Sequence, residues 1–384
     1  MTPKNFPNSI AIAGAWGYIG RKLLDAALRR GVKAYVYDPG PTPAGIDLAA
    51  FTRISNAVEF YNLEADLFHL ALHPGGRAEA LEALIKRGTT QPLFILNEKP
   101  MVSPDRPEDG QRLIESVERS QVAMLYDFPE LFDPLTQRIV EYLRSFREVT
   151  LSSIFVQRSK DREDPAISRN RKLMQPIQFQ ESVHCLAFAM YILAILKGDL
   201  ESVFSKGIAV TAKSSPYSPP NPEDYPFIVD GRCKYQLHLG PILVEGLTDF
   251  KREAEWTKRR ILWGIADGRP FTIEADYFEG AKYLKIDGID QKWNRDDCSY
   301  EAILSTIEDW RRSLPRTTLL HGIYPNPQFA WIAYQLSGVL WKSSHNGAPI
   351  ELSNLEALNK FDSGFRAARE HLPPYPTSST TEVS

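Results

Sequence analysis

The stretch SIAIAGAWGYIGRKLLDAALRRG, residues 9–31, decides the fold of the first part of this chain. An apolar run ends at Gly14, and Gly17 and Gly20 follow before a segment with apolar residues at helical spacing. Glycines at such a turn allow the backbone to approach a pyrophosphate, and the next helix presents free N–H groups to the anion. An acidic residue is expected about 20 positions later, and Asp38 ends the next apolar run. The stretch therefore predicts a dinucleotide-binding turn.

Strand-like and helical patterns alternate up to residue 127, which is typical of a parallel sheet covered by helices. Later runs at 148–159, 207–213, 227–240, 242–250, 259–268, 269–276 and 281–288 follow one another with few helices, which favours an antiparallel sheet. We expect an α/β Rossmann domain over residues 1–127 and an α+β domain with an open, mostly antiparallel sheet over 128–372. We expect a disordered tail over 373–384, because it is rich in Pro, Ser and Thr.

The composition excludes several classes of protein. The chain has 384 residues, a net charge of −3 and 24% charged residues. It therefore has no net positive charge to attract the phosphate backbone of a nucleic acid. No apolar run is long enough to span a membrane, and we expect the run at 185–196 to be a buried helix. The three cysteines are scattered and lack zinc-ligand spacing, which predicts a cytoplasmic protein without disulfides or a bound metal.

The glycine spacing has two interpretations. Either Ala15 takes the first position of G-x-G-x-x-G, or Gly14, Gly17 and Gly20 form G-x-x-G-x-x-G. The second pattern resembles extended short-chain dehydrogenases and sugar-nucleotide epimerases, which use a Tyr-x-x-x-Lys pair for proton transfer. Downstream of the glycine turn, which itself holds Tyr18 and Lys22, no tyrosine has a lysine four residues later, and YFEGAK (277–282) is one residue too long. The assignment to these dehydrogenases and epimerases is therefore rejected, whereas an alanine at the first glycine position and an inserted residue both remain possible for the turn.

Residues 65–102 point to another family. The segment ADLFHLALHPGGRAEALEALIKRGTTQPLFILNEKPMV has a strand, a His-Pro step, a helix and a strand ending in Glu-Lys-Pro. It resembles the glucose–fructose oxidoreductase / inositol dehydrogenase / rhizopine catabolism (Gfo/Idh/MocA) family, over roughly residues 8–345. The resemblance implies an NAD(P)-dependent oxidoreductase that transfers a hydride between nicotinamide and a sugar, a cyclitol or a sugar derivative.

The resemblance also implies the roles of residues in the first domain. Lys99 would lie beside the nicotinamide and contact the substrate hydroxyl, Glu98 would face the cofactor, and the Lys99–Pro100 peptide is a candidate for the cis form. No Arg or Lys directly follows Asp38, which favours NAD, with NADP possible. The predicted cofactor-binding residues are Gly14, Ala15, Trp16, Gly17, Tyr18, Ile19, Asp38, Leu72, His73, Pro74, Glu98 and Lys99.

The family's D-x-x-x-H motif matches QESVHCLAF, residues 180–188. His184 stands at the histidine position and is the proposed base, but Gln180 replaces the aspartate and cannot take a proton. Glu181 is adjacent, yet it is turned about 100° around a helix. We therefore expect a catalytic pair of Lys99 and His184, with Gln180, Tyr126 and Arg158 as substrate-binding residues.

The basic segment QRSKDREDPAISRNRK, residues 157–172, is expected to be a solvated sheet edge and loop. The alternative is that Arg158, Arg169 or Arg171 binds an acidic group of the substrate.

Two other functions remain open. One is an NAD-dependent enzyme that cleaves glycosidic bonds, and the other is a non-catalytic dinucleotide sensor similar to the galactose-regulon repressor of yeasts. For any of these functions we expect a small-molecule ligand and a homo-oligomer, a dimer or tetramer, formed through the sheet domain.

Overall fold

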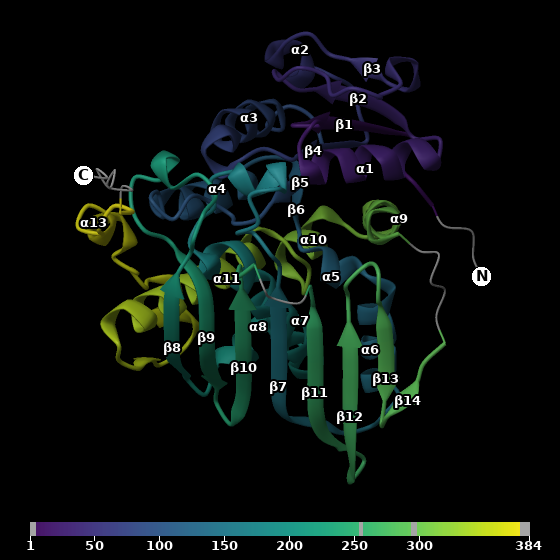
Figure 1. The fold of residues 1–384 in the computed structure, drawn as a ribbon. Coiled ribbons are helices and arrows are strands. Elements are labelled where there is room, and N and C mark those ends of the chain that lie inside the picture. The colour runs from purple at the N-terminus through teal and green to yellow at the C-terminus, as the bar shows by residue number, and fades with distance from the viewer. Residues whose placement is uncertain (1–4, 253–255, 293–297, 377–384) are drawn as a thin grey trace, which may run out of the picture. The chain divides into compact units, whose positions relative to one another are not determined.

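The computed structural model describes residues 5–252, 256–292 and 298–376 (Figure 1). The chain divides into two compact units, and each consists of segments that are not contiguous in sequence. The first unit contains residues 1–146, 190–200 and 292–333, and the second contains 147–189, 201–291 and 334–384. The first unit thus includes three segments, 128–146, 190–200 and 292–333, that the sequence assigned to the second domain.

The first unit is built on a six-stranded sheet with the order β3-β2-β1-β4-β5-β6. All five strand pairs are parallel, as the alternation of strands and helices predicts. This order is that of a Rossmann sheet, and the strand order reverses between β1 and β4. The strands are β1 (Ser9–Ala13), β2 (Lys33–Tyr37), β3 (Thr52–Arg53), β4 (Leu67–Leu70), β5 (Leu93–Glu98) and β6 (Val122–Asp127).

Helices of the first unit bury one face of this sheet. Alternate strand residues such as Ile12, Leu96 and Leu125 pack with Leu23 of α1 and Ile303 of α9 in one core cluster. The helices that lie wholly in this unit are α1 (Tyr18–Arg29), α2 (Ala57–Tyr61), α3 (Pro74–Arg87), α4 (Glu108–Glu118), α5 (Pro129–Phe132), α6 (Pro134–Arg144), α9 (Ser299–Ser313) and α10 (Arg316–His321), with one 3₁₀ turn at Leu48–Ala50.

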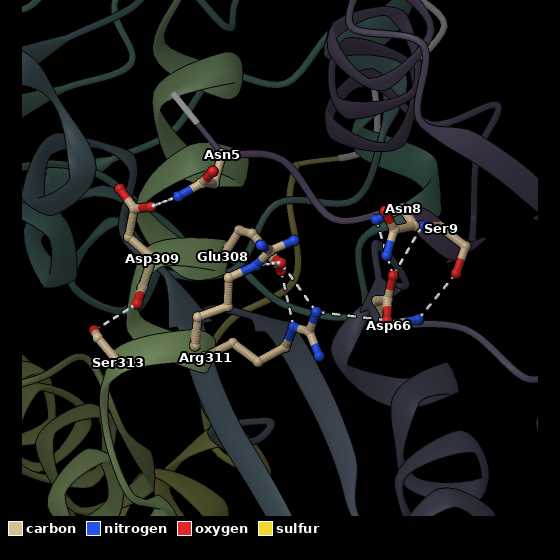
Figure 2. Close-up of polar contacts among 9 residues, drawn as sticks. Asn5, Asn8, Ser9, Asp66, Glu308, Asp309, Arg311 and Ser313 are labelled. Carbon is tan, nitrogen blue, oxygen red and sulfur yellow. Dashed lines mark hydrogen bonds and ion pairs between the residues drawn. The ribbon is translucent and has the colours of Figure 1, made fainter. Parts of the chain in front are cut away.

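The segment before β1 is fastened to other parts of the first unit by the polar contacts in Figure 2. The backbone N–H groups of Asn8 and Ser9 donate to the Asp66 carboxylate at 2.8 and 3.2 Å. Arg311 of α9 lies 3.5 Å from the same carboxylate and also pairs with Glu308. These contacts hold the start of β1 beside β4 and α9.

The second unit is built on a nine-stranded sheet with the order β14-β13-β12-β11-β7-β10-β9-β8-β15. Every pair is antiparallel except β7 with β10, which confirms the mostly antiparallel sheet. The strands are β7 (Val149–Ser159), β8 (Ile208–Pro216), β9 (Asp230–Leu239), β10 (Ile242–Asp249), β11 (Arg259–Ala266), β12 (Arg269–Asp276), β13 (Tyr283–Ile286), β14 (Ile289–Asp290) and β15 (Ile350–Leu352).

Two long helices have residues in both units, α7 (Val183–Lys197) and α11 (Pro327–Asn346). A π-helical turn, Gln178–Ser182, leads directly into α7. Among the described residues, Gln178–Lys197 is one helix long and apolar enough to cross a membrane, but 83% of it is buried inside the molecule. The run at 185–196 is therefore a core helix, as expected. The remaining helices are α8 (Leu200–Phe204), α12 (Leu355–Asn359) and α13 (Phe365–Arg369), with 3₁₀ turns at Ser168–Arg171 and Pro222–Asp224.

The predicted disordered tail begins too early. The carbonyl of Pro373 accepts the N–H of Ile228, and the Tyr375 hydroxyl accepts the N–H of Val229 at 3.1 Å. The Tyr375 ring also packs edge-on against Tyr225. Aromatic burial therefore fixes residues 373–375 on the second unit, whereas 377–384 lie outside the described residues.

Candidate functional site

The glycine turn after β1 decides between the two interpretations of its spacing. Gly14 has φ +76°, and a Cβ there would lie 2.5 Å from the carbonyl oxygen of Ala71. A Cβ on Gly20 would lie 2.3 Å from the carbonyl oxygen of Gly14. Gly14 thus forms the tight turn and Gly20 allows the close approach of α1, the roles of the first and third glycines of the motif. Ala15 is fully buried in the core, so the turn has one inserted residue rather than an alanine in place of a glycine.

The first turn of α1 is suited to an anion. The helix has Gly17 at its N-cap, no side-chain cap and no acidic residue in its first turn. The N–H groups of that turn have no partner within the helix, and they form its positive end. A Cβ on Gly17 would lie 3.2 Å from the carbonyl oxygen of Gly14, so the turn is tightly packed where a pyrophosphate approaches the backbone.

Asp38 follows β2 and closes this turn from the side. Its carboxylate accepts the N–H of Trp16 at 2.9 Å and the N–H of Gly40 at 2.8 Å. A carboxylate has about four lone-pair sites, so two remain for ribose hydroxyls. The Trp16 ring packs against Phe51 at 5.9 Å between centroids, which makes it a packing residue beside the turn. The residues present therefore fit a dinucleotide.

The predicted residues after β4 lie at the same edge of the sheet. Leu72 is 3.1 Å from the position of a Cβ on Gly14, so the segment after β4 meets the glycine turn where the strand order reverses. His73 caps α3, where its Nδ1 accepts the N–H of Gly75 at 3.4 Å, and Pro74 is the first residue of this helix. Tyr18 is 47% exposed on α1.

Lys99 follows β5 directly, and the Lys99–Pro100 peptide is cis, which confirms that expectation. Since β4, β5 and β6 are parallel and adjacent, Lys99 stands at the carboxyl edge of the sheet, where ligands bind in such folds. Its side chain is half-buried.

Beside Lys99, three buried polar residues form a cluster that sequence reasoning missed. Glu98 pairs in register with Asp127, and His69 Nε2 lies 3.2 Å from Glu98 Oε1. His69 and Asp127 are at most 1% exposed, and ligand-type atoms of all three residues lie within 4.8 Å of one another. Strand pairing, which no local pattern reveals, places the Glu98 and Asp127 carboxyls next to the buried His69.

Burial decides the protonation of this cluster. It lowers the pKa of His69 to about 4, so the ring is neutral at neutral pH. Burial and the Glu98 carboxylate raise the pKa of Asp127 well above its usual range. Two adjacent buried carboxyls cannot both ionise cheaply, so the pair shares a proton. Such a group could also hold a metal, and the expectation that this protein binds none stays a prediction.

Tyr126 lies on the opposite face of the strands from Asp127. Its side chain is fully buried, and burial raises the pKa of its hydroxyl to about 12, against the nearby positive charge of Arg77. Arg77, from α3, donates to Asn97 Oδ1 at 3.3 Å and to the carbonyl of Pro100. In this structure Tyr126 is a fully buried residue of β6, and its contact with substrate stays a prediction.

In the second unit, the start of α7 carries the residues of the family-like motif. Ser182 bonds Thr248 of β10 at 2.7 Å and ties the π-helical turn to the sheet. Gln180 accepts the N–H of Gln175 at 2.8 Å, and its amide nitrogen contacts Met174 Sδ at 3.1 Å. His184 is 3% exposed in the first turn of α7.

The expectation of a solvated sheet edge at the start of residues 157–172 is wrong, because β7 lies inside the sheet, whereas Ala166, Arg171 and Lys172 of the loop are exposed as expected. Arg158 and Arg162 are buried, and both pair with Glu181, as does Lys160. Glu181 is therefore the carboxylate around which these basic side chains lie, although the sequence analysis named Gln180 and not Glu181 as a site residue. Two sequence signals could have indicated this cluster: a carboxylate at the start of an apolar helix, and basic residues at positions 158, 160 and 162, where a strand ends.

No protein-family model matches the chain, and no curated protein matches it. Several solved structures, however, match the chain over most of its length. A myo-inositol dehydrogenase from Corynebacterium glutamicum is 16% identical with a TM-score of 0.64, over 90% of this chain and 98% of that one. A super-repressor mutant of Gal80p from Saccharomyces cerevisiae is 14% identical with a TM-score of 0.68, over 93% and 100%. An aldose-aldose oxidoreductase from Caulobacter crescentus is 13% identical with a TM-score of 0.65, over 90% and 99%.

At these identities the similarity establishes the fold. The chain therefore has the two-part fold shared by these dehydrogenase, oxidoreductase and Gal80p structures, which confirms the fold that the resemblance to the Gfo/Idh/MocA family implied.

Proposed function

We propose that this protein is an NAD(P)-dependent oxidoreductase that acts on a CH–OH carbon of a sugar, a cyclitol or a sugar derivative. The observation that carries the proposal is the glycine turn between β1 and α1. Its backbone leaves no room for side chains at Gly14 and Gly20, and it lies at the switch point of a parallel sheet. The fold similarity to structures titled as dehydrogenases and oxidoreductases supports it.

A nicotinamide bound at this edge would supply the hydride chemistry. In our proposal Asp38 accepts hydrogen bonds from the ribose, and the N-terminus of α1 holds the pyrophosphate. No Arg or Lys directly follows Asp38 in the sequence to pair with a 2′-phosphate, which supports NAD over NADP.

Lys99 is the proposed group that contacts the reacting hydroxyl. Its ammonium stabilises negative charge that develops on oxygen as the proton leaves. The buried Glu98–Asp127 pair lies directly beside Lys99 in the sequence and in the sheet, and its negative charge attracts the lysine ammonium. His184 is the proposed base, because a neutral imidazole can take the proton of a hydroxyl group.

A second function is supported by Gln180. It stands where the family has an aspartate, cannot ionise, and is bonded to the 174–175 backbone and side chain. Two of the structures with this fold are Gal80p proteins, one of them titled a transcriptional regulator from Kluyveromyces lactis. A dinucleotide-binding sensor is therefore the alternative.

One experiment separates these functions. The full-length protein is first titrated with NAD, NADP and their reduced forms by calorimetry, and then incubated with each cofactor and a panel of sugars, cyclitols, sugar acids and their oxidised forms. Steady formation or consumption of NAD(P)H supports the oxidoreductase. Dinucleotide binding without turnover on any member supports the sensor, and absence of dinucleotide binding contradicts both.

A further inference from the structure

Arg77 is a charged residue in the buried stripe of α3. The other buried residues of this helix follow it at helical spacing and are all apolar: Ala80, Leu81, Leu84 and Ile85. Arg77 is 2% exposed, so its guanidinium lies inside the first unit. Burial lowers its pKa to about 10, against the charge of Glu98, so the group stays a cation at neutral pH. A buried cation is costly where an apolar side chain would continue the stripe, so its hydrogen bonds indicate its role.

The guanidinium is bonded to the turn that carries Lys99. Its Nη2 donates to the carbonyl of Pro100, the residue after Lys99, and its Nη1 donates to Asn97 Oδ1 at 3.3 Å. The same Asn97 oxygen accepts the N–H of Glu98, the residue before Lys99, at 3.0 Å. Arg77 therefore holds backbone groups on both sides of Lys99, one directly and the other through Asn97.

An arginine is suited to this arrangement. Its planar fork donates in two directions at once, whereas a lysine ammonium is a compact charge on a flexible stem. The acceptor Asn97 is fully buried at the end of β5, so strand pairing fixes its position. The donor comes from α3, which begins at Pro74 directly after His73. Through Arg77, one helix thus joins the predicted cofactor-binding segment after β4 to the turn after β5.

We propose that Arg77 is a positioning residue for Lys99. Lys99 is the first residue after β5, so the direction of its side chain depends on how the residues on either side of it are held. Arg77 holds them so that the ammonium points to the place of the reacting hydroxyl. A displacement of a reacting group by about 1 Å can lower a rate on the order of 100-fold. The inference rests on the proposed function for the reacting hydroxyl, whereas the effect of Arg77 on the Lys99 side chain does not.

The first measurement follows the Lys99 side chain and needs no turnover. The full-length protein is produced with lysine labelled with ¹³C at Cε, and the Lys99 signal is assigned in a proton–carbon correlation spectrum by its loss in Lys99→Met. We expect Arg77→Met to move this signal toward those of exposed lysines and to narrow it, because the turn is no longer held.

Arg87→Met is the matched control. Arg87 is the last residue of the same helix, and its guanidinium also donates to two backbone carbonyls, those of Tyr61 and Leu63, at 2.8 and 2.6 Å. These carbonyls lie before β4, away from the turn after β5. The Lys99 signal should therefore be the same in Arg87→Met as in the wild type.

The second measurement is kinetic. With a substrate identified by the panel described above, Arg77→Met should lower kcat at least about 10-fold, while the dissociation constant of NAD changes less than about 2-fold. In a Lys99→Met background the same substitution should cause no further loss, because a residue that acts through Lys99 then has nothing left to position. A merely structural role would give the same loss in both backgrounds.

Arg77→Lys keeps the inference testable if Arg77→Met does not fold. It retains the charge and one donor, so it should shift the Lys99 signal and lower kcat less than the methionine does, in the same directions. Circular dichroism and the melting temperature verify the folding of each variant. An unchanged Lys99 signal or an unchanged kcat in a folded Arg77 variant overturns the inference, as do equal losses in the two backgrounds. A displaced Lys99 signal in a protein that turns over no member of the panel contradicts the proposed function alone.

Discussion

Gly20→Ala provides the sharpest test of the glycine turn. Gly20 lies in the first turn of α1, where alanine is ordinarily the better helix former by about 1 kcal/mol. The structure predicts the opposite result. A Cβ would lie 2.3 Å from the carbonyl oxygen of Gly14 and 2.8 Å from Ala15 Cα, whereas ordinary contact begins at 3.4 Å. Both atoms are backbone, so no side-chain rotation relieves the overlap, and α1 must move away from β1.

We expect Gly20→Ala to lower the free energy of unfolding by about 1–3 kcal/mol, the usual cost of overpacking a well-packed site. Because the turn that faces the pyrophosphate is displaced, NAD affinity should also fall at least 10-fold. The matched control is Gly76→Ala in α3, where a Cβ meets no atom within 4 Å and φ is not positive. That variant should be as stable as the wild type or more stable, by up to about 1 kcal/mol.

The assay is urea unfolding of both variants by circular dichroism, with NAD titration by calorimetry. Equal urea midpoints for Gly20→Ala and the wild type, together with unchanged NAD affinity, would refute the close approach of α1 and β1. A loss of stability in Gly76→Ala of the same size would show that a general effect, not the contact with Gly14, is responsible.

Three further predictions concern charged groups of the first unit. Asp127→Asn should raise the melting temperature above that of the wild type, and the gain should appear above the unfolded aspartate pKa of about 3.9 and grow with pH. The reason is that the pKa of Asp127 is raised in the folded state, so its carboxyl stabilises the folded protein only at low pH, where it is protonated. Equal melting curves of the variant and the wild type from pH 4 to 9 would contradict this reasoning. Asp38→Ala should weaken NAD binding and leave NADP binding unchanged or improved, which competition titrations measure; an equal loss for both cofactors would argue against a ribose contact. Lys99→Met should lower kcat by about 10²–10⁴-fold with NAD affinity nearly intact, while Lys86→Met at the end of α3 should not, and unchanged turnover would remove Lys99 from the mechanism.

Much of the first unit could be predicted from sequence because its signals are local. The glycines between β1 and α1, the apolar periodicity of α1 and the acidic end of β2 lie within 30 residues of one another. Each step of the β-α alternation is built from neighbouring residues. The predicted strand that ends in Glu-Lys-Pro therefore matches β5, which ends at Glu98.

The tertiary structure decided what depends on contacts between distant segments. The β5–β6 register sets Asp127 against Glu98, and the β4–β5 pairing brings His69 to the same carboxyl pair. In the second unit, β7 pairs parallel with β10, although about 80 residues separate them in sequence and hairpins dominate the rest of the sheet.

The basic segment after β7 shows the same limit most clearly. Its composition predicts a solvated run of charge, and only the packing of the helix start at Glu181 shows that Arg158 and Arg162 are buried. The sequence by itself thus determined the strands, the glycine turn and the family-like motifs, because hydrophobic periodicity and turn chemistry are local. Strand pairing and burial determined which charges meet, because they depend on residues far apart along the chain.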